Sequence, residues 1–197
     1  MKNNHLFDLH THRHDAPANA FINLPMEVLS GKLAFTPLPG RSYSAGIHPL
    51  FEGDWEKALI QLVGISIHPQ IKAIGECGLD NRSKTPLPTQ IEFLQRQAEL
   101  AQEQSKPLII HCVHCWNELI ATCKPSKVPY IVHGFRGKPQ LAQQLLRAGF
   151  SLSFGPLFNP ESLKLCPPQK YYLETDDNPG LSIQQVANLH AIARESE

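Results

Sequence analysis

Short apolar segments alternate along this chain with longer amphipathic ones. The short segments have the length of β-strands, and several are bounded by proline or glycine, which is typical of strands that end in turns. The sequence therefore predicts eight strands, at residues 5–9, 20–24, 42–46, 72–75, 108–111, 130–133, 151–154 and 171–174.

The longer segments repeat apolar residues every three or four positions, as one face of a helix requires. Gly149 is placed to end one helix, and Ser182 is placed to cap the start of the last one. The predicted helices cover residues 54–65, 88–104, 116–124, 138–149 and 182–195.

Strands that alternate with helices favour parallel βα units, and eight strands predict a closed (β/α)₈ barrel. The 197 residues lie just below the usual lower limit of about 200 for this fold. We expect one domain over residues 1–197. Only ten residues separate the first two strands, too few for a loop and a full helix. The barrel should therefore be distorted in its N-terminal quarter, with a short or missing helix, and irregular over residues 26–41.

Composition narrows the class of protein without naming a function. The formal net charge is zero, so bulk charge gives no reason to expect a nucleic-acid or membrane partner. No apolar run is long enough for a transmembrane helix, and the first residues contain no apolar signal core. The five cysteines are an odd number without framework spacing, which favours reduced thiols. A cytoplasmic protein is the expectation.

The candidate chemistry lies where the predicted strands end. Because all strand C-termini of a βα barrel open onto one face, side chains far apart in sequence can converge there. His10 and His12 can also share a strand face, since residues two apart point the same way. Each residue alone has an ordinary reading as a surface, turn or helix-start residue, but five strand ends of this kind together predict a metal site. The ligand-type residues are His10, His12, Glu76, His111, His133 and Asp176.

Six motifs, in this order, resemble those of the TatD-type metal-dependent hydrolases, a family of amidohydrolase-like TIM barrels. They are "DLHTH", "SAGIHP", "AIGECGLD", "PLIIHC", "IVHGFRG" and "YYLETD". The resemblance implies a dinuclear site and deoxyribonuclease activity. His10, His12, Glu76 and Asp176 would hold one metal ion, and Glu76 would bridge to a second ion on His111 and His133.

Three departures from the family pattern bear on the substrate. The N-terminal third is shortened, the tail after "ETD" is short, and Val113 stands where the family often has arginine. Two alternatives remain. A PHP-type phosphoesterase also begins with H-x-H, but this chain lacks its terminal D-x-H pair. A non-catalytic descendant that binds metal or nucleic acid is the other.

The predicted chemistry is hydrolysis by a water that two divalent ions activate. The mixed nitrogen and oxygen donors suit Zn, Mn, Ni or Fe better than Mg. Asp176 is the expected proton shuttle, with Glu76 beside it. The expected substrate carries phosphate, such as single-stranded DNA ends; no membrane partner is expected, and the oligomeric state stays open. The candidate substrate contacts are His48, Arg13, Arg82 and Arg136.

Overall fold

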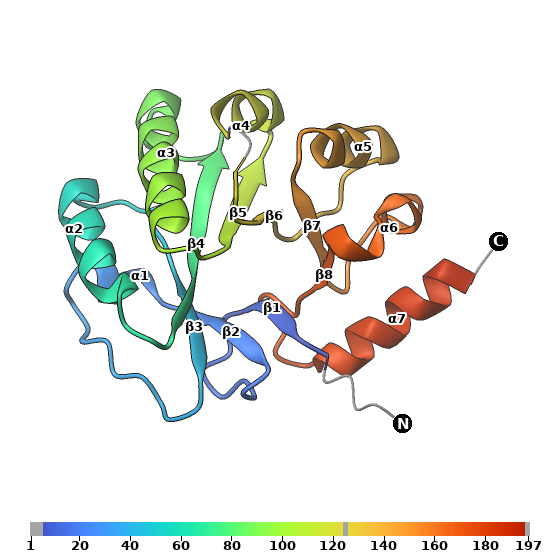
Figure 1. The fold of residues 1–197 in the computed structure, drawn as a ribbon, viewed down its shortest axis with the longest axis horizontal. Coiled ribbons are helices and arrows are strands. Elements are labelled where there is room, and N and C mark those ends of the chain that lie inside the picture. Colours follow the sequence, from blue (N-terminus) through green and yellow to red (C-terminus); the bar gives the residue numbers. More distant parts are fainter. Residues whose placement is uncertain (1–5, 124–125, 196–197) are drawn as a thin grey trace.

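The computed structural model describes residues 6–123 and 126–195. Eight parallel strands close into one barrel in chain order, with the first strand paired to the last (Figure 1). This confirms the predicted (β/α)₈ architecture. The strands are β1 Asp8–Thr11, β2 Ala20–Asn23, β3 Ser42–Ala45, β4 Ile71–Asp80, β5 Leu108–Val113, β6 Tyr130–Val132, β7 Ser151–Phe154 and β8 Tyr171–Leu173.

The helices cover the barrel unevenly. Figure 1 shows substantial helices beside the later strands, whereas the segments that join the first three strands are mostly loop. No described helix is long and apolar enough to cross a membrane. The helices are α1 Met26–Leu29, α2 Trp55–Ser66, α3 Leu87–Glu103, α4 Trp116–Thr122, α5 Pro139–Arg147, α6 Pro160–Leu165 and α7 Ile183–Glu195, with a 3₁₀ turn at Pro168–Lys170.

The N-terminal quarter has the distortion that the sequence predicts. No helix lies between β1 and β2, and only the four residues of α1 form a helix between β2 and β3. The short helix α6 was not predicted from the sequence, because six residues are too few to show a helical period. Its start is nevertheless capped, since the Asn159 side chain accepts a hydrogen bond from the amide of Ser162.

Strand β4 was predicted too short. It continues past residue 75 to Asp80, so it carries Glu76 inside the strand and not at its end. Glycines interrupt the apolar pattern here, and one of them is required by the packing. Gly78 has φ 146°, and a Cβ at this position would collide with the carbonyl oxygen of His111 on β5. The close approach of β4 to β5 brings His111 beside Glu76.

The predicted helix ends agree with local hydrogen bonds. The Asp54 side chain caps α2 by accepting from the amide of Lys57, and Gly149 follows α5 with φ 97°. Before α7, the Ser182 hydroxyl accepts from the amide of Gln185, and the Gln185 side chain accepts from the amide of Ser182. This reciprocal pair is a capping box. Residue 5 of the first predicted strand and residue 124 of the third predicted helix lie outside the described residues.

Two apolar clusters separate the inside of the barrel from its outside. The larger cluster fills the space between the sheet and the helices. The smaller one contains Leu9, Ala73, Ile109 and Ile131. Ile109 and Ile131 each lie two residues before a candidate metal ligand, so they share its inward face. Apolar packing inside the barrel therefore supports the polar groups at its C-terminal mouth.

Candidate metal centre

The carboxylate of Glu76 lies at the centre of the polar cluster. Its Oε2 atom is 3.4 Å from Nε2 of His10 and 3.7 Å from Nε2 of His12. Both histidines come from the end of β1, with Thr11 between them. The i, i+2 relation therefore places both rings at one oxygen of Glu76, as strand geometry predicts.

The other oxygen of Glu76 faces a second set of imidazoles. Oε1 lies 2.9 Å from Nδ1 of His111 and 2.7 Å from Nε2 of His133. It also lies 3.1 Å from Nε2 of His48, which follows β3. One buried carboxylate thus separates two groups of imidazoles, one on each oxygen.

Asp176 completes the first group. Its Oδ1 atom is 3.8 Å from Nε2 of His10 and 3.7 Å from Nε2 of His12. The main chain holds the residue between β8 and β1, because its amide donates to the carbonyl of His10 and its own carbonyl accepts from the amide of His12. Asp176 has φ 51°, a conformation that costs a non-glycine residue about 1–3 kcal/mol and that surrounding contacts must maintain.

The carboxylate and the imidazoles of the cluster shift one another's pKa values. Burial raises the pKa of Glu76, but the charge of His133 and hydrogen bonds from the imidazoles outweigh it, so the pKa lies well below its usual value. Burial lowers the pKa of His133, yet the charge and hydrogen bond of Glu76 raise it to about 10. Burial and the His133 charge lower the pKa of His10. The carboxylate is therefore ionised among imidazoles of unlike basicity.

Several buried polar atoms of the cluster have no hydrogen-bond partner among the described residues. Both ring nitrogens of His10 are in this state, as are Nδ1 of His133 and Oε2 of Glu174. Unpartnered buried polar groups are costly, and a bound cation could satisfy Nε2 of His10, which faces Glu76 and Asp176. His10, His133 and Asp176 each offer a ligand atom within 4.8 Å of the others, and so do His10, His12 and Glu76. The residues present therefore fit a divalent cation.

Asp80 is a functional candidate that the sequence interpretation passed over. It is fully buried at the end of β4, and its Oδ2 atom lies 2.9 Å from Nε2 of His111. The Arg82 guanidinium forms an ion pair with the same carboxylate at 2.6 Å. Burial would raise the pKa of Asp80, but the bonds from Arg82 and His111 outweigh it, so the pKa lies below its usual value. A carboxylate behind a metal-binding histidine fixes its ring and tautomer. The motif "GLD" already placed Asp80 four residues after Glu76.

Two more buried carboxyl groups lie behind the cluster. Burial raises the pKa of Glu174 to about 7, and the residue accepts a hydrogen bond from the amide of Gly134 at 2.5 Å. Burial raises the pKa of Asp8 to about 6, opposed by two bonds from Thr175. These bonds connect β1 to the segment after β8, so Asp8 helps to hold His10 and Asp176 side by side.

The cluster opens into a cavity of about 520 Å³ at the C-terminal mouth of the barrel. Its lining combines the imidazoles and carboxylates with four apolar residues, called here the apolar wall: Leu24, Pro25, Met26 and Leu50. This wall comes from the segments that follow β2 and β3, and the segment after β2 contains only the four residues of α1. The distorted quarter therefore contributes to the lining of the cavity.

The predicted substrate contacts are only partly near this cavity. His48 lines it, whereas Arg13, Arg82 and Arg136 are not among its lining residues. Arg13 pairs with Asp15 at 3.2 Å, and Arg82 is engaged by Asp80. Loop arginines close to a strand end in sequence can point away from the barrel mouth, and sequence spacing gives no signal for their direction. Their contact with substrate stays a prediction.

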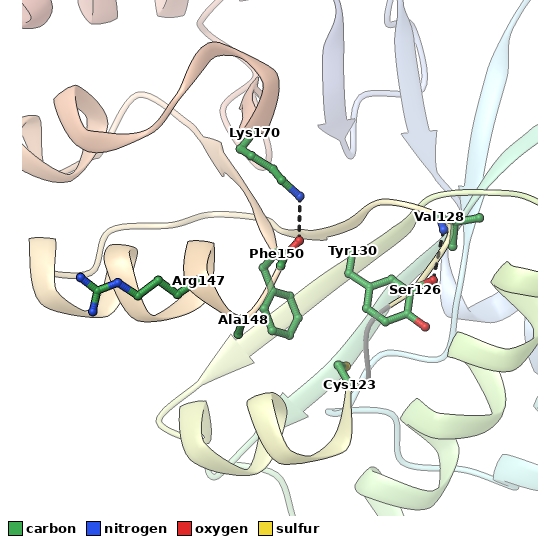
Figure 2. A pocket seen from close by; sticks show the side chains of 9 residues that line it. Cys123, Ser126, Val128, Tyr130, Arg147, Ala148, Phe150 and Lys170 are labelled. Atoms are coloured by element: carbon green, nitrogen blue, oxygen red, sulfur yellow. Dashed lines mark hydrogen bonds between the residues drawn. The ribbon is translucent and has the colours of Figure 1, made fainter.

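A second cavity, of about 340 Å³, lies near the N-terminal ends of β6 and β7, away from the C-terminal mouth of the barrel (Figure 2). Arg147 and Lys170 line it together with Tyr130 and Phe150, and the Lys170 ammonium donates to the carbonyl of Gly149 at 2.8 Å. Among its described lining residues there is no histidine or carboxylate. It therefore lacks the donor groups that metal-assisted hydrolysis requires.

The barrel and its cluster of histidines and carboxylates define the class of metal-dependent hydrolases built on (β/α)₈ folds. Within that class, the family described as TatD related DNase matches residues 33–194. The chain belongs to this family. The family and the His, Glu and Asp cluster together indicate a site for divalent metal ions.

Individual relatives agree with this assignment. The 3'-5' ssDNA/RNA exonuclease TatD of Klebsiella pneumoniae is 30% identical over 167 residues, which are 78% of this chain and 63% of the relative. The uncharacterized metal-dependent hydrolase YabD of Bacillus subtilis is 32% identical over 143 residues, 66% of this chain and 56% of the relative. The chain aligns with 58–63% of the length of the first curated relatives.

Solved structures show the same fold. The crystal structure of YJJV, a TatD homolog from Escherichia coli, superimposes with a TM-score of 0.76 and 21% sequence identity. The match covers 98% of this chain and 91% of that chain. The family match favours a TatD-type protein over the PHP-type alternative.

Proposed function

We propose that this protein is a metal-dependent hydrolase that cleaves phosphodiester bonds, with the ends of single-stranded nucleic acid as substrate. The observation that carries the proposal is Glu76, whose two oxygens face separate sets of imidazoles. A carboxylate in this position can bridge two cations about 3.5–4 Å apart, the spacing used for in-line displacement at phosphorus.

The two sides of Glu76 define two ligand sets. His10, His12 and Asp176 would hold one ion with Oε2, and His111 and His133 would hold the other with Oε1. Nδ1 of His111 faces Glu76 while Nε2 faces Asp80, so ligation through Nδ1 would keep the Asp80 contact. Bound divalent ions would supply Lewis-acid activation of water and neutralise phosphate charge. Nitrogen-rich donor sets favour Zn, Mn, Fe or Ni over Mg.

His48 has a different role in this proposal. Its Nδ1 accepts a hydrogen bond from the amide of Leu50 at 3.1 Å, so the neutral ring carries its proton on Nε2. That nitrogen faces Oε1 of Glu76 and the cavity. His48 can therefore donate a hydrogen bond to Glu76 or to a substrate oxygen, as the predicted substrate contact requires.

The charge of the cavity also supports a requirement for cations. Glu27, Glu76, Asp176 and Asp177 line it, and no lysine or arginine is among its lining residues in the described parts of the chain. A phosphodiester would be repelled by these carboxylates unless positive charge compensates them. Binding of anionic substrate should therefore depend on metal more than on the loop arginines.

Asp176 is the proposed proton acceptor. Its side chain is only partly buried and lines the cavity, so it can reach both the ligand set and a water beside the substrate. It would take a proton from the attacking water and return it to the leaving oxygen. The apolar wall around Met26 and Leu50 would pack against the base or sugar of the terminal nucleotide. The names of the TatD relatives support single-stranded DNA or RNA as the polymer.

A metal-loaded activity screen tests the proposal. Purified protein with Mn²⁺, Zn²⁺ or Mg²⁺ would be offered single-stranded DNA and RNA, mononucleotides, phosphomonoesters and small amides. We expect release of mononucleotides from strand ends and no activity in chelator. Hydrolysis of amides alone would refute phosphodiester chemistry, and metal binding without hydrolysis of any substrate would favour a non-catalytic binder.

A further inference from the structure

Asn23, the last residue of β2, contacts the main chain of Glu76. Its side-chain Oδ1 accepts a hydrogen bond from the amide of Glu76 at 3.1 Å and another from the hydroxyl of Ser44 at 3.2 Å. The donor in the first bond is a backbone N–H, so the atom that faces it must be the oxygen of the carboxamide. The side chain thus spans from β2 across β3 to β4.

The amide of Glu76 needs such an acceptor because the strand pairing is interrupted around it. The β4–β5 register shifts between Ile74 and Cys77, and the β3–β4 pairs end with Ala45 opposite Ile74. Glu76 falls inside this interval and is buried. A buried backbone N–H outside the ladder must find another acceptor or lose a hydrogen bond. Asn23 supplies that acceptor.

The close packing around Glu76 leaves little space for another group that could accept this hydrogen bond. A Cβ on Gly46, just after β3, would lie 2.5 Å from Cα of Gly75 and 2.8 Å from the carbonyl oxygen of Glu76. The main chain after β3 therefore presses directly on the Gly75–Glu76 segment, and a larger residue at Gly46 would displace it. The Asn23 carboxamide reaches the same segment from β2.

We propose that Asn23 is a positioning residue that fixes the Glu76 main chain and thereby aims its carboxylate between the two sets of imidazoles. This inference rests on the role of Glu76 as the shared ligand in the proposed function. Both Glu76 oxygens already lie within 2.7–3.7 Å of five imidazoles. A small shift of the Glu76 main chain would therefore spoil both ligand sets at once.

The chain offers a matched pair of substitutions for a test. Asn23→Asp keeps an oxygen acceptor on a side chain of the same shape. It replaces the Nδ2 donor, for which no described residue provides an acceptor, with a second oxygen, and it adds a negative charge, so the exchange of the Glu76 amide reports the hydrogen bond separately from cation affinity. Asn23→Leu has a similar volume but accepts no hydrogen bond, and Asn23→Ala is a milder version if the leucine variant does not fold. Ser44→Ala removes the second donor to Oδ1 and leaves the Glu76 bond in place.

Two measurements should be made on all variants. In metal-free protein, NMR hydrogen exchange should show a protected Glu76 amide in wild type, Asn23→Asp and Ser44→Ala, and faster exchange in Asn23→Leu. Calorimetric titration with Mn²⁺ or Zn²⁺ should then show affinity weakened about 10- to 100-fold in Asn23→Leu. Asn23→Asp should restore affinity close to that of the wild type.

The inference is overturned if Asn23→Leu and Asn23→Ala keep both the protected amide and the wild-type affinity. It is also overturned if Asn23→Asp loses as much as Asn23→Leu, since the acceptor would then not be the feature that matters. The proposed function fails separately. A wild-type protein that binds metal and shows the Asn23 effects but cleaves no phosphodiester refutes the hydrolase and leaves the positioning role intact.

Discussion

The first two strands and the last six differ in the helices that cover them. From β3 onward each strand is followed by a helix, which covers the outside of the barrel (Figure 1). Between β1 and β3 there are loops and the four residues of α1. We call the part from β1 to β3 the thin region and the rest of the barrel the covered region. His10 and His12 from the thin region nevertheless lie close to Glu76, His111 and His133 from the covered region. Strand pairing brings the candidate ligands together, while the segments after β2 and β3 supply the apolar residues of the cavity around them.

The largest expected effect tests the centre that both regions share. Asp176→Asn removes the proposed proton acceptor but keeps the shape of the side chain, so the fold should survive. With metal bound, turnover should fall about 100- to 10,000-fold. Steady-state rates on single-stranded DNA would measure this, with circular dichroism and metal content as controls. Wild-type turnover in the metal-loaded variant would remove Asp176 from this role.

A second prediction compares helical cover in the two regions. Leu145 in α5 and Leu29 in α1 are both fully buried. Leu145→Ala should lower the free energy of unfolding by about 3–4 kcal/mol, and Leu29→Ala by about 2–3 kcal/mol, because a short helix can collapse around the missing atoms. Chemical denaturation measures both values. The comparison breaks if Leu29→Ala is the more damaging substitution.

A third prediction concerns Met26, a residue of the apolar wall that lies in the thin region. Met26→Ala should raise KM about fivefold, equivalent to roughly 1 kcal/mol, because substrate loses apolar contact. The value of kcat should change little, since Met26 has no part in the proposed proton transfer. Ile60→Ala, on the exposed face of α2 away from the cavity, is the matched control. Equal KM values in all three proteins would show that the wall does not contact substrate.

The smallest effect is a pH dependence in the covered region. His190 of α7 contacts the Tyr171 hydroxyl at 2.7 Å and the Gly155 carbonyl at 2.8 Å, and packs against Phe158. Burial lowers its pKa, and the charge of Arg194 lowers it further, while the bond to Gly155 opposes them. The folded state therefore resists protonation.

Because the unfolded chain binds this proton more readily, stability should fall as the pH drops through the ordinary value of 6.5 toward the lower folded value. His190→Gln should be less stable at neutral pH, yet lose less on acidification. Urea unfolding of both proteins between pH 7.5 and about 5 would measure the difference. Parallel pH curves would show that His190 does not contribute to the dependence.

The sequence was a good guide to the fold wherever strands and helices are long and regular. Strand β7 was predicted to the residue, and the starts of α2 and α7 follow from Asp54 and Ser182. Prediction was poorest at β4, where glycines break the apolar pattern but allow β4 to approach β5 closely. The local pattern of apolar and polar residues indicates periodicity, but it cannot predict how closely another strand approaches.

The candidate ligands could be read from the sequence because parallel strands must bring their C-terminal ends together, whatever lies between them. His10, Glu76 and His133 therefore converge as the strand pattern alone predicts. The sequence could not predict three other features of the site. These are the directions of Arg13 and Arg82, the carboxylate of Asp80 behind His111, and the bond from the Glu76 amide to Asn23. Each depends on side-chain orientation or on a break in strand pairing, and only the packed tertiary structure decides these.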